Sequence, residues 1–307
     1  MISGYKAMPQ DIASSNAPDN SKAFHSKFSS YELDEDPVKL IPRPQTIRWE
    51  HKHIEITAIS FIPLNNTDSH VLDKEVTQIC KDYRIVLKQD NSYRIAFLTD
   101  KNVLPEGYIM EVTKKGINIK ASTESGHYYA LQTLRQLLRQ KSDGVLQLEL
   151  CRIEDHPAFP IRGYMIDVGR NFQTMASLKK QLDIMSKYKL NTFHWHLTDR
   201  PAWRIESKAY PQLVAPENHR PTRDPGKYYT YNDIRELISY ARERQITIIP
   251  EIDMPGHSDS FVQAMGFRME SNEGMNALKT VLNEFFSEIP KEMAPMIHIG
   301  SDEIRIR

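Results

Sequence analysis

Four short, apolar, β-prone runs recur in the C-terminal half of the sequence, and segments of helical period separate them. The runs are IRGYMIDVG from 161, NTFHWHLTD from 191, ITIIPEID from 246 and MIHIGSDE from 296. Between them, apolar residues recur every three or four positions: Leu178, Leu182 and Met185; Ile234, Leu237, Ile238 and Ala241; Leu278, Val281, Leu282 and Phe285. Alternating strands and helices are typical of a parallel sheet, either doubly wound or closed into a barrel. The sequence therefore predicts an α/β domain over residues 156–307.

The residues before this domain follow a different pattern. Over 107–122, two alternating runs flank Lys114-Lys115-Gly116, which indicates a hairpin because glycine accepts positive φ. Strand-like segments at 54–62, 93–99 and 145–153, with helical segments near 71–82 and 130–138, complete a small non-catalytic α+β domain over 38–155. Residues 1–37 are polar without sustained periodicity, so we expect a poorly ordered N-terminal arm.

Each strand-like run of the C-terminal domain ends in groups that bind or transfer protons. They are Asp167 and Arg170; Asp199; Asp253 and His257; Asp302 and Glu303. Sites of parallel α/β folds lie at the carboxyl ends of the strands. We therefore expect an active site there; the alternative, carboxylates that cap the following helices, explains one or two of these groups more easily than all of them.

The adjacent carboxylates Asp302 and Glu303 constrain the chemistry. Glycosidases with two opposed carboxylates place them across a sugar ring, and neighbouring residues cannot straddle one. Neighbours on a strand point to opposite sides, so one carboxylate can reach a leaving oxygen while the other serves a different atom. This division fits substrate assistance, in which Glu303 protonates the glycosidic oxygen and Asp302 orients a substrate amide. The alternative is an ordinary helix-capping pair.

Two other motifs have functional and structural interpretations. Arg162, inside an apolar strand, offers a planar fork for hydroxyls or a carboxylate, or else forms an internal salt bridge. His194 and His196 share one face of a strand. They could hold a metal as in a metal-dependent hydrolase, but we favour histidines hydrogen-bonded inside the fold, and no metal or cofactor is predicted.

Composition restricts the partners. The 40 basic and 40 acidic residues cancel without long runs of one sign, which argues against nucleic acid and anionic lipid. The two cysteines, Cys80 and Cys151, have no CxxC spacing and suggest neither a disulfide framework nor a zinc site. No apolar stretch approaches the roughly 20 residues of a membrane span. The polar start lacks the apolar core of a signal peptide, yet a removed signal would leave no trace, so the compartment stays open.

Several motifs together resemble a known family. FPIRGYMIDVGRNF, NTFHWHLTDRPAWRIESKAYPQL, IIPEIDMPGH and IHIGSDE look like successive signatures of the β-N-acetylhexosaminidases of glycoside hydrolase family 20. EGYIMEVTKKGINIKASTESGHYYALQTLRQLL resembles their small domain, so the likeness covers about 40–307.

The resemblance implies a fold, a reaction and roles for individual residues. It implies a (β/α)₈ TIM-type barrel and a retaining, exo-acting enzyme that releases terminal β-linked GlcNAc or GalNAc through an oxazolinium intermediate. Glu303 matches the general acid/base and Asp302 the residue that orients the acetamido group. Arg162 matches the arginine that grips sugar hydroxyls, while Asp199 and His257 match supporting substrate-binding residues. It also makes a periplasmic, extracellular or lysosomal location consistent with the sequence.

Two local departures and the length bear on these expectations. Gly300-Ser301 stands where the family often has Gly-Gly, and Arg200-Pro201-Ala202-Trp203 where it often has Asp-Gln-Gly-Trp, so substrate preference is expected to differ. A complete barrel needs about 250 residues, and residues 161–307 accommodate only about the first four βα units. We expect the chain alone to lack the complete pocket and to self-associate through open half-barrel edges. The alternative is a non-catalytic carbohydrate-binding or assembly fragment.

Overall fold

The computed structural model describes residues 36–64, 70–90 and 92–301. The chain divides into two units, Met1–Lys39 and Leu40–Arg307, and the fold below is that of the second unit. The predicted N-terminal arm lies almost wholly outside the described residues, as do Asp302 and Glu303. No helix in the described part of the chain has both the length and the apolar character needed to cross a membrane.

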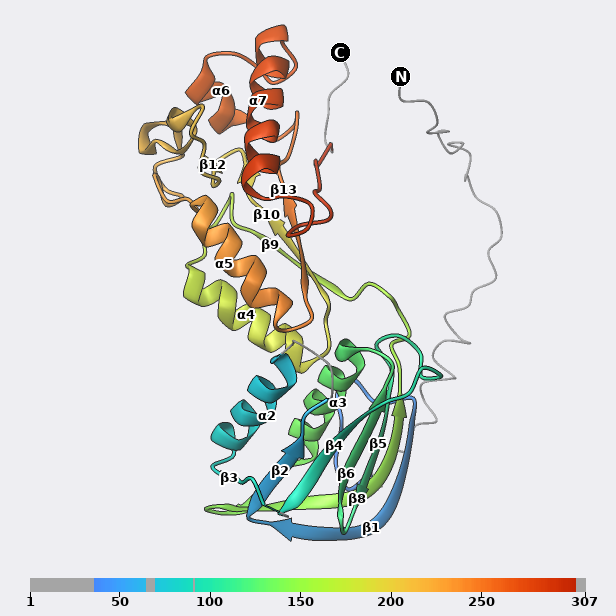
Figure 1. The fold of residues 1–307 in the computed structure, drawn as a ribbon. Coiled ribbons are helices and arrows are strands. Elements are labelled where there is room, and N and C mark those ends of the chain that lie inside the picture. The colour runs from blue at the N-terminus through green and yellow to red at the C-terminus, as the bar shows by residue number, and fades with distance from the viewer. Residues whose placement is uncertain (1–35, 65–69, 91, 302–307) are drawn as a thin grey trace, which may run out of the picture. The chain divides into compact units, whose positions relative to one another are not determined.

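The small domain is a mixed β-sheet, with both antiparallel and parallel strand pairs, and its helices lie on one face (Figure 1). Its strands, in spatial order, are β1 (Thr46–Ile56), β8 (Val145–Asp155), β5 (Tyr108–Thr113), β6 (Gly116–Ala121), β4 (Tyr93–Thr99), β2 (Ala58–Ile62) and β3 (Val86–Leu87), and β7 (Arg139–Ser142) pairs with β8. Helices α2 (Val71–Asp82) and α3 (Glu124–Leu137) pack against each other, and α3 packs on β5 and β6. The predicted hairpin is β5–β6, and at its turn Gly116 has a φ of +153°.

One expected strand of this domain proves to be parts of two strands. The run at 54–62 divides at Thr57 into the end of β1 and the whole of β2. Ile54 and Ile56 pair antiparallel with β8, whereas Ile59 and Phe61 pair parallel with β4. The continuous apolar run therefore serves two different neighbours in the sheet, which its periodicity alone does not reveal.

The C-terminal domain is built on a parallel sheet in the order β13-β10-β9. β9 (Gly163–Asp167) lies at one edge, β10 (Thr192–His196) in the middle and β13 (Thr247–Glu251) on the other side. The register places His196 beside both Asp167 and Glu251, so the carboxyl ends of all three strands meet.

Helices follow the strands as the apolar periodicity predicts. α4 (Met175–Lys187) and α5 (Tyr231–Arg242) pack against each other, and their predicted apolar stripes are buried. Thr230 begins α5 with a capping box to Asp233. The remaining elements are β11 (Thr198–Asp199), β12 (Ala202–Trp203), the short helices η1 (Pro211–Val214) and η2 (Pro216–Asn218), α6 (Asp259–Met265) and α7 (Asn272–Glu288).

The fourth predicted strand is reduced to a single parallel bridge between Glu251 and His298. Backbone bonds extend the contact: His298 N donates to Pro250 O at 2.9 Å, Ile252 N to His298 O at 3.1 Å and Met254 N to Ile299 O at 3.0 Å. The segment thus occupies the next position of the sheet, beside β13, in the spatial order expected of successive βα units.

Candidate active site

Predicted site residues from three successive strand ends meet at the carboxyl edge of the parallel sheet. Asp167 ends β9, Asp199 lies in β11 just after β10, and His257 lies in the loop after β13. Asp199 Oδ1 is 3.6 Å from His257 Nδ1, and both side chains are buried. The structure therefore brings together Asp199 and His257, as the sequence predicts.

Arg170 joins this group from the end of β9. Its guanidinium lies 3.1 Å from Asp199 Oδ2 and 3.3 Å from Asp167 Oδ2, and Nη2 is 3.4 Å from His257 Nδ1. The side chain of Arg170 is 52% exposed, whereas that of Asp199 is 1% exposed. Two carboxylates thus orient an arginine whose side chain remains half exposed, an arrangement suited to hydroxyl recognition.

Asp199 is held as an anion. Burial alone would raise the pKa of its carboxyl group, but hydrogen bonds from His196 and from the Arg200 N–H, together with the charge of Arg170, lower it below its ordinary value. The Arg200 N–H donates to Asp199 Oδ1 at 2.5 Å. The site therefore combines a fixed negative charge with a half-exposed positive one.

Gly169 makes this arrangement sterically feasible. A Cβ placed on Gly169 would lie 2.7 Å from Asp199 Cβ and 2.8 Å from Asp199 N. Real Cβ atoms do not approach other atoms so closely, so the chain beyond β9 can pass over Asp199 only with glycine at this position.

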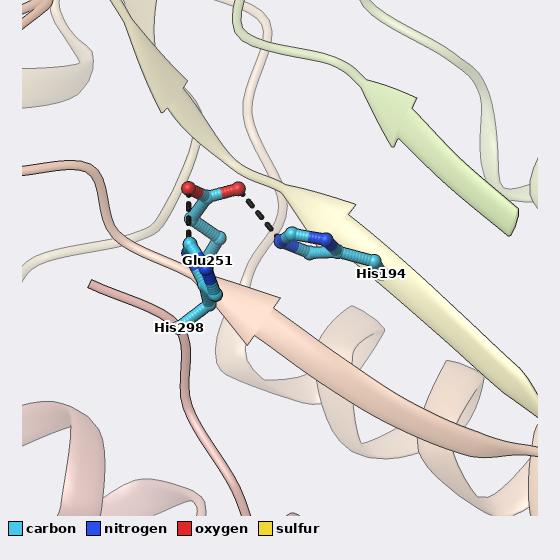
Figure 2. A group of neighbouring side chains, drawn as sticks. All are labelled: His194, Glu251 and His298. Carbon is cyan, nitrogen blue, oxygen red and sulfur yellow. Dashed lines mark hydrogen bonds and ion pairs between the residues drawn. The ribbon is translucent and has the colours of Figure 1, made fainter. Parts of the chain in front are cut away.

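A network of histidines surrounds Glu251, and Figure 2 shows two of them, His194 and His298, converging on its carboxylate. Glu251 accepts from His196 Nδ1 at 2.6 Å and from His298 Nδ1 at 2.8 Å. His194 Nε2 lies 2.7 Å from Glu251 Oε2, a close contact without the hydrogen-bond geometry of the other two. The other ring nitrogen of His196, Nε2, is 3.1 Å from Asp199 Oδ2, so His196 links the network to the site.

The contacts in this network determine the charge states of His196 and Glu251. Burial opposes protonation of His196, but hydrogen bonds to Asp199 and Glu251 outweigh it and raise the pKa of His196 to about 10. Burial likewise opposes the Glu251 anion, but His194 and His196 lower the pKa of Glu251 far below its ordinary range. His196 is thus a cation held between two carboxylates.

These pKa shifts predict a pH-dependent stability. The pKa of His196 is higher in the folded state, so its contribution is complete below about pH 6.5 and declines toward pH 10. The contribution of Glu251, with a lowered pKa, is present above about pH 4.5 and is lost on acidification. We expect urea unfolding at pH 5–6.5 to give a His196→Gln destabilisation larger by on the order of 2 kcal/mol than at pH 9.5. Equal destabilisation at both pH values would contradict the assignment.

The two histidines of HWH therefore converge on one carboxylate, and the hydrogen-bonded interpretation applies to His196, whereas His194 makes only a close contact. Ligand atoms of His194, Glu251 and His298 also lie within 4.8 Å of one another, as do those of Asp167, His196 and Asp199. Both sets share residues with the network, in which a protonated His196 would compete with a cation. Metal-dependent hydrolysis gains no specific support from this geometry.

The prediction for Arg162 is corrected by its position. Arg162 precedes β9, so roughly 17 Å of strand separates it from Asp167 at the other end. Its Nε donates to Lys189 O at 2.7 Å, and Nη1 donates to Phe159 O at 2.9 Å and to Glu106 Oε2 at 3.0 Å. The internal salt bridge considered for Arg162 is the one observed. Arg170, eight residues later, occupies the carboxyl end of the strand, and that position was the available signal in the sequence.

The described chain stops just before the predicted acid pair. Gly300 has a φ of +70°, and a Cβ there would lie 1.7 Å from Asp253 Oδ1. Ser301 also has a positive φ, 77°, and its hydroxyl donates to Met254 O at 3.3 Å. The roles of Asp302 and Glu303 stay predictions.

Comparisons with known proteins agree with this architecture. Residues 159–307 match the catalytic domain of glycosyl hydrolase family 20, and residues 38–156 match domain 2 of the same family. The chain is 33% identical to a beta-hexosaminidase of Vibrio furnissii, over 88% of this chain and 49% of the relative. It is 32% identical to a beta-hexosaminidase of Porphyromonas gingivalis, over 87% of this chain and 39% of the relative.

Solved structures give the same result. A GH20 exo beta-N-acetylglucosaminidase from Vibrio harveyi, in complex with N-acetylglucosamine, superposes with a TM-score of 0.76 at 29% identity, over 86% of this chain and 47% of that one. A beta-N-acetylhexosaminidase from Bacteroides fragilis gives 0.73 at 29% identity, over 87% and 57%. The α/β fold of the C-terminal domain is that of a TIM-barrel-like catalytic domain. The chain belongs to glycosyl hydrolase family 20, and it spans about half the length of the first relatives it matches.

Proposed function

We propose that the protein is an exo-acting, retaining β-N-acetylhexosaminidase that removes terminal β-linked GlcNAc or GalNAc. The observation that carries the proposal is the convergence of Arg170, Asp199 and His257 at the carboxyl ends of successive strands in a chain of this family. Relatives named for this activity and a solved relative bound to N-acetylglucosamine support it.

In this proposal each group has a distinct task. Arg170, oriented by Asp167 and Asp199, donates to hydroxyls of the terminal sugar. Glu303 protonates the glycosidic oxygen, and Asp302 orients the acetamido group so that its oxygen attacks the anomeric carbon. Asp199 and His257 contact each other, and both contact Arg170, so they hold its guanidinium in position.

The arginine assignment can be tested with a matched pair. We expect Arg170→Gln, in the protein encoded by the complete reading frame, to lower kcat/KM for a chromogenic N-acetylglucosaminide by about 100-fold, because the charged donors to the sugar are lost. Arg162→Gln should leave kcat/KM within about threefold and lower thermal stability instead, since Arg162 binds Glu106 and two carbonyl groups. A large loss of kcat/KM in the Arg162 variant alone would reverse the assignment.

The acid role of Glu303 separates the enzyme from a carbohydrate-binding fragment. Glu303→Gln should abolish hydrolysis while sugar binding persists. Hydrolysis at equal rates in the parent and the variant, or binding without hydrolysis in both, would favour the non-catalytic alternative.

Self-association through the edge of β9 also stays a prediction. Tyr164 and Met165 on that strand are 43% and 47% exposed, and light scattering tests whether copies of the chain associate.

A further inference from the structure

The site opens into a cavity whose wall is unusually rich in arginine. The cavity, about 270 Å³, is lined by Arg170, Asp199 and His257 together with Arg200, Arg220 and Arg223. Among the residues that the structure describes, four arginines thus accompany one lining carboxylate. The neutral hydroxyl groups of a sugar ring can be bound without several positively charged side chains.

Two of these arginines, Arg220 and Arg223, have no carboxylate partner within the described part of the chain. Arg170 is paired with Asp167 and Asp199. Arg220 and Arg223 are exposed, and neither forms an ion pair with any residue that the structure describes. Arg223 Nη1 donates to the amide oxygen of Asn171 at 2.5 Å, a neutral partner that orients the guanidinium without cancelling its charge.

The loop that carries these arginines is anchored from below by Arg204. Arg204 is fully buried, and its guanidinium donates to Arg223 O at 2.6 Å and to Val168 O at 3.0 Å. The same loop is fixed by Arg220 N, which donates to Pro201 O at 2.8 Å. One buried side chain therefore ties the loop to the chain just beyond β9, two residues before Arg170, and holds the arginines at a defined place beside the site.

We propose that Arg220 and Arg223, with Arg200 beside them, recognise an oxyanion carried by the glycan substrate. The inference rests on the proposed glycosidase function and specifies its substrate class. Guanidinium forks match the geometry of sulfate and carboxylate oxygens and bind them more strongly than neutral hydroxyls. The oxyanion is either a sulfate ester on the terminal amino sugar or the carboxylate of a uronic acid linked to it. The departure from the family pattern at Arg200-Pro201 lies on this wall.

Calorimetric binding to the protein encoded by the complete reading frame tests the proposal. The probes are N-acetylglucosamine, N-acetylglucosamine 6-sulfate and the disaccharide of N-acetylglucosamine β-linked to glucuronic acid. The double variant Arg220→Gln/Arg223→Gln is compared with Arg84→Gln/Arg268→Gln, which removes the same charge from side chains that are 79% and 76% exposed elsewhere.

We expect at least one anionic probe to bind about tenfold or more tightly than the neutral sugar, with an advantage that falls as salt rises. The advantage should disappear in the Arg220/Arg223 variant and persist in the control, and the probe that shows it identifies the source of the oxyanion. Equal binding of all three probes, or an advantage that survives in the Arg220/Arg223 variant, overturns the inference and leaves the glycosidase proposal intact. Binding of none of them overturns both.

Discussion

Replacing Glu251 with glutamine is expected to lower the free energy of unfolding by about 3 kcal/mol at pH 6. Glu251 is 4% exposed and lies against three imidazoles, one of which, His196, is a cation. Glutamine keeps the shape but removes the charge, and breaking a buried ion pair from one side leaves the other charge uncompensated. Urea unfolding of the parent chain and the variant, followed by circular dichroism, measures the difference.

A surface pair supplies the control for Glu251. Glu236 pairs with Lys179 at 2.5 Å, and its side chain is 57% exposed. Glu236→Gln should change the free energy of unfolding by less than about 1 kcal/mol, because exposed ion pairs contribute little. If the two variants lost the same stability, the network would not be the buried electrostatic centre that its geometry indicates.

Replacing Gly169 with alanine is expected to damage both stability and the site. The new Cβ would meet the backbone nitrogen and the Cβ of Asp199 at less than 3 Å, so β11 or the end of β9 must move. Overpacking of this kind costs about 2–3 kcal/mol. Because Asp199 orients Arg170, the shift should also lower kcat/KM by roughly 100-fold, the effect of misplacing a positioning group by about 1 Å.

Gly163, at the other end of β9, provides a matched control for Gly169. A Cβ at Gly163 finds its nearest neighbour, Thr192 O, at 3.5 Å, which is an ordinary contact. Gly163→Ala should therefore stay within about 1 kcal/mol of the parent in stability and leave kcat/KM unchanged. Similar losses in both variants would show that β9 tolerates no side chain and that the contact with Asp199 has no special role.

The elements that the sequence predicts best are those with one buried face. The stripes of α4, α5 and α7 follow directly from their apolar spacing, and the parallel runs at β9, β10 and β13 follow from short apolar segments between helices. The run at 54–62 does not follow from its apolar spacing in the same way. Periodicity records that residues are buried but not by which neighbour, so the division at Thr57 is invisible in it.

Only part of the candidate site could likewise be predicted from the sequence. The rule that polar groups gather at carboxyl strand ends brings Asp199 and His257 together correctly and points to Arg170. Arg162 lies in the same motif, but its partner Glu106 comes from a distant part of the sequence, so its structural use could not be read locally. The three-way use of Glu251 was equally hidden, because His194, His196 and His298 reach it from two different segments.

Arg204 gives the arginine loop a property that the histidine network lacks. Its hydrogen-bond acceptors, in the part of the chain that the structure describes, are all carbonyl oxygens, which neither gain nor lose protons in water. These hydrogen bonds between Arg204 and the loop therefore end on dipoles that do not titrate, and acid or alkali that rearranges charge around Glu251 leaves their partners unaltered. The charges around Glu251 thus change with proton activity, whereas the carbonyl groups that Arg204 binds in the neighbouring loop do not.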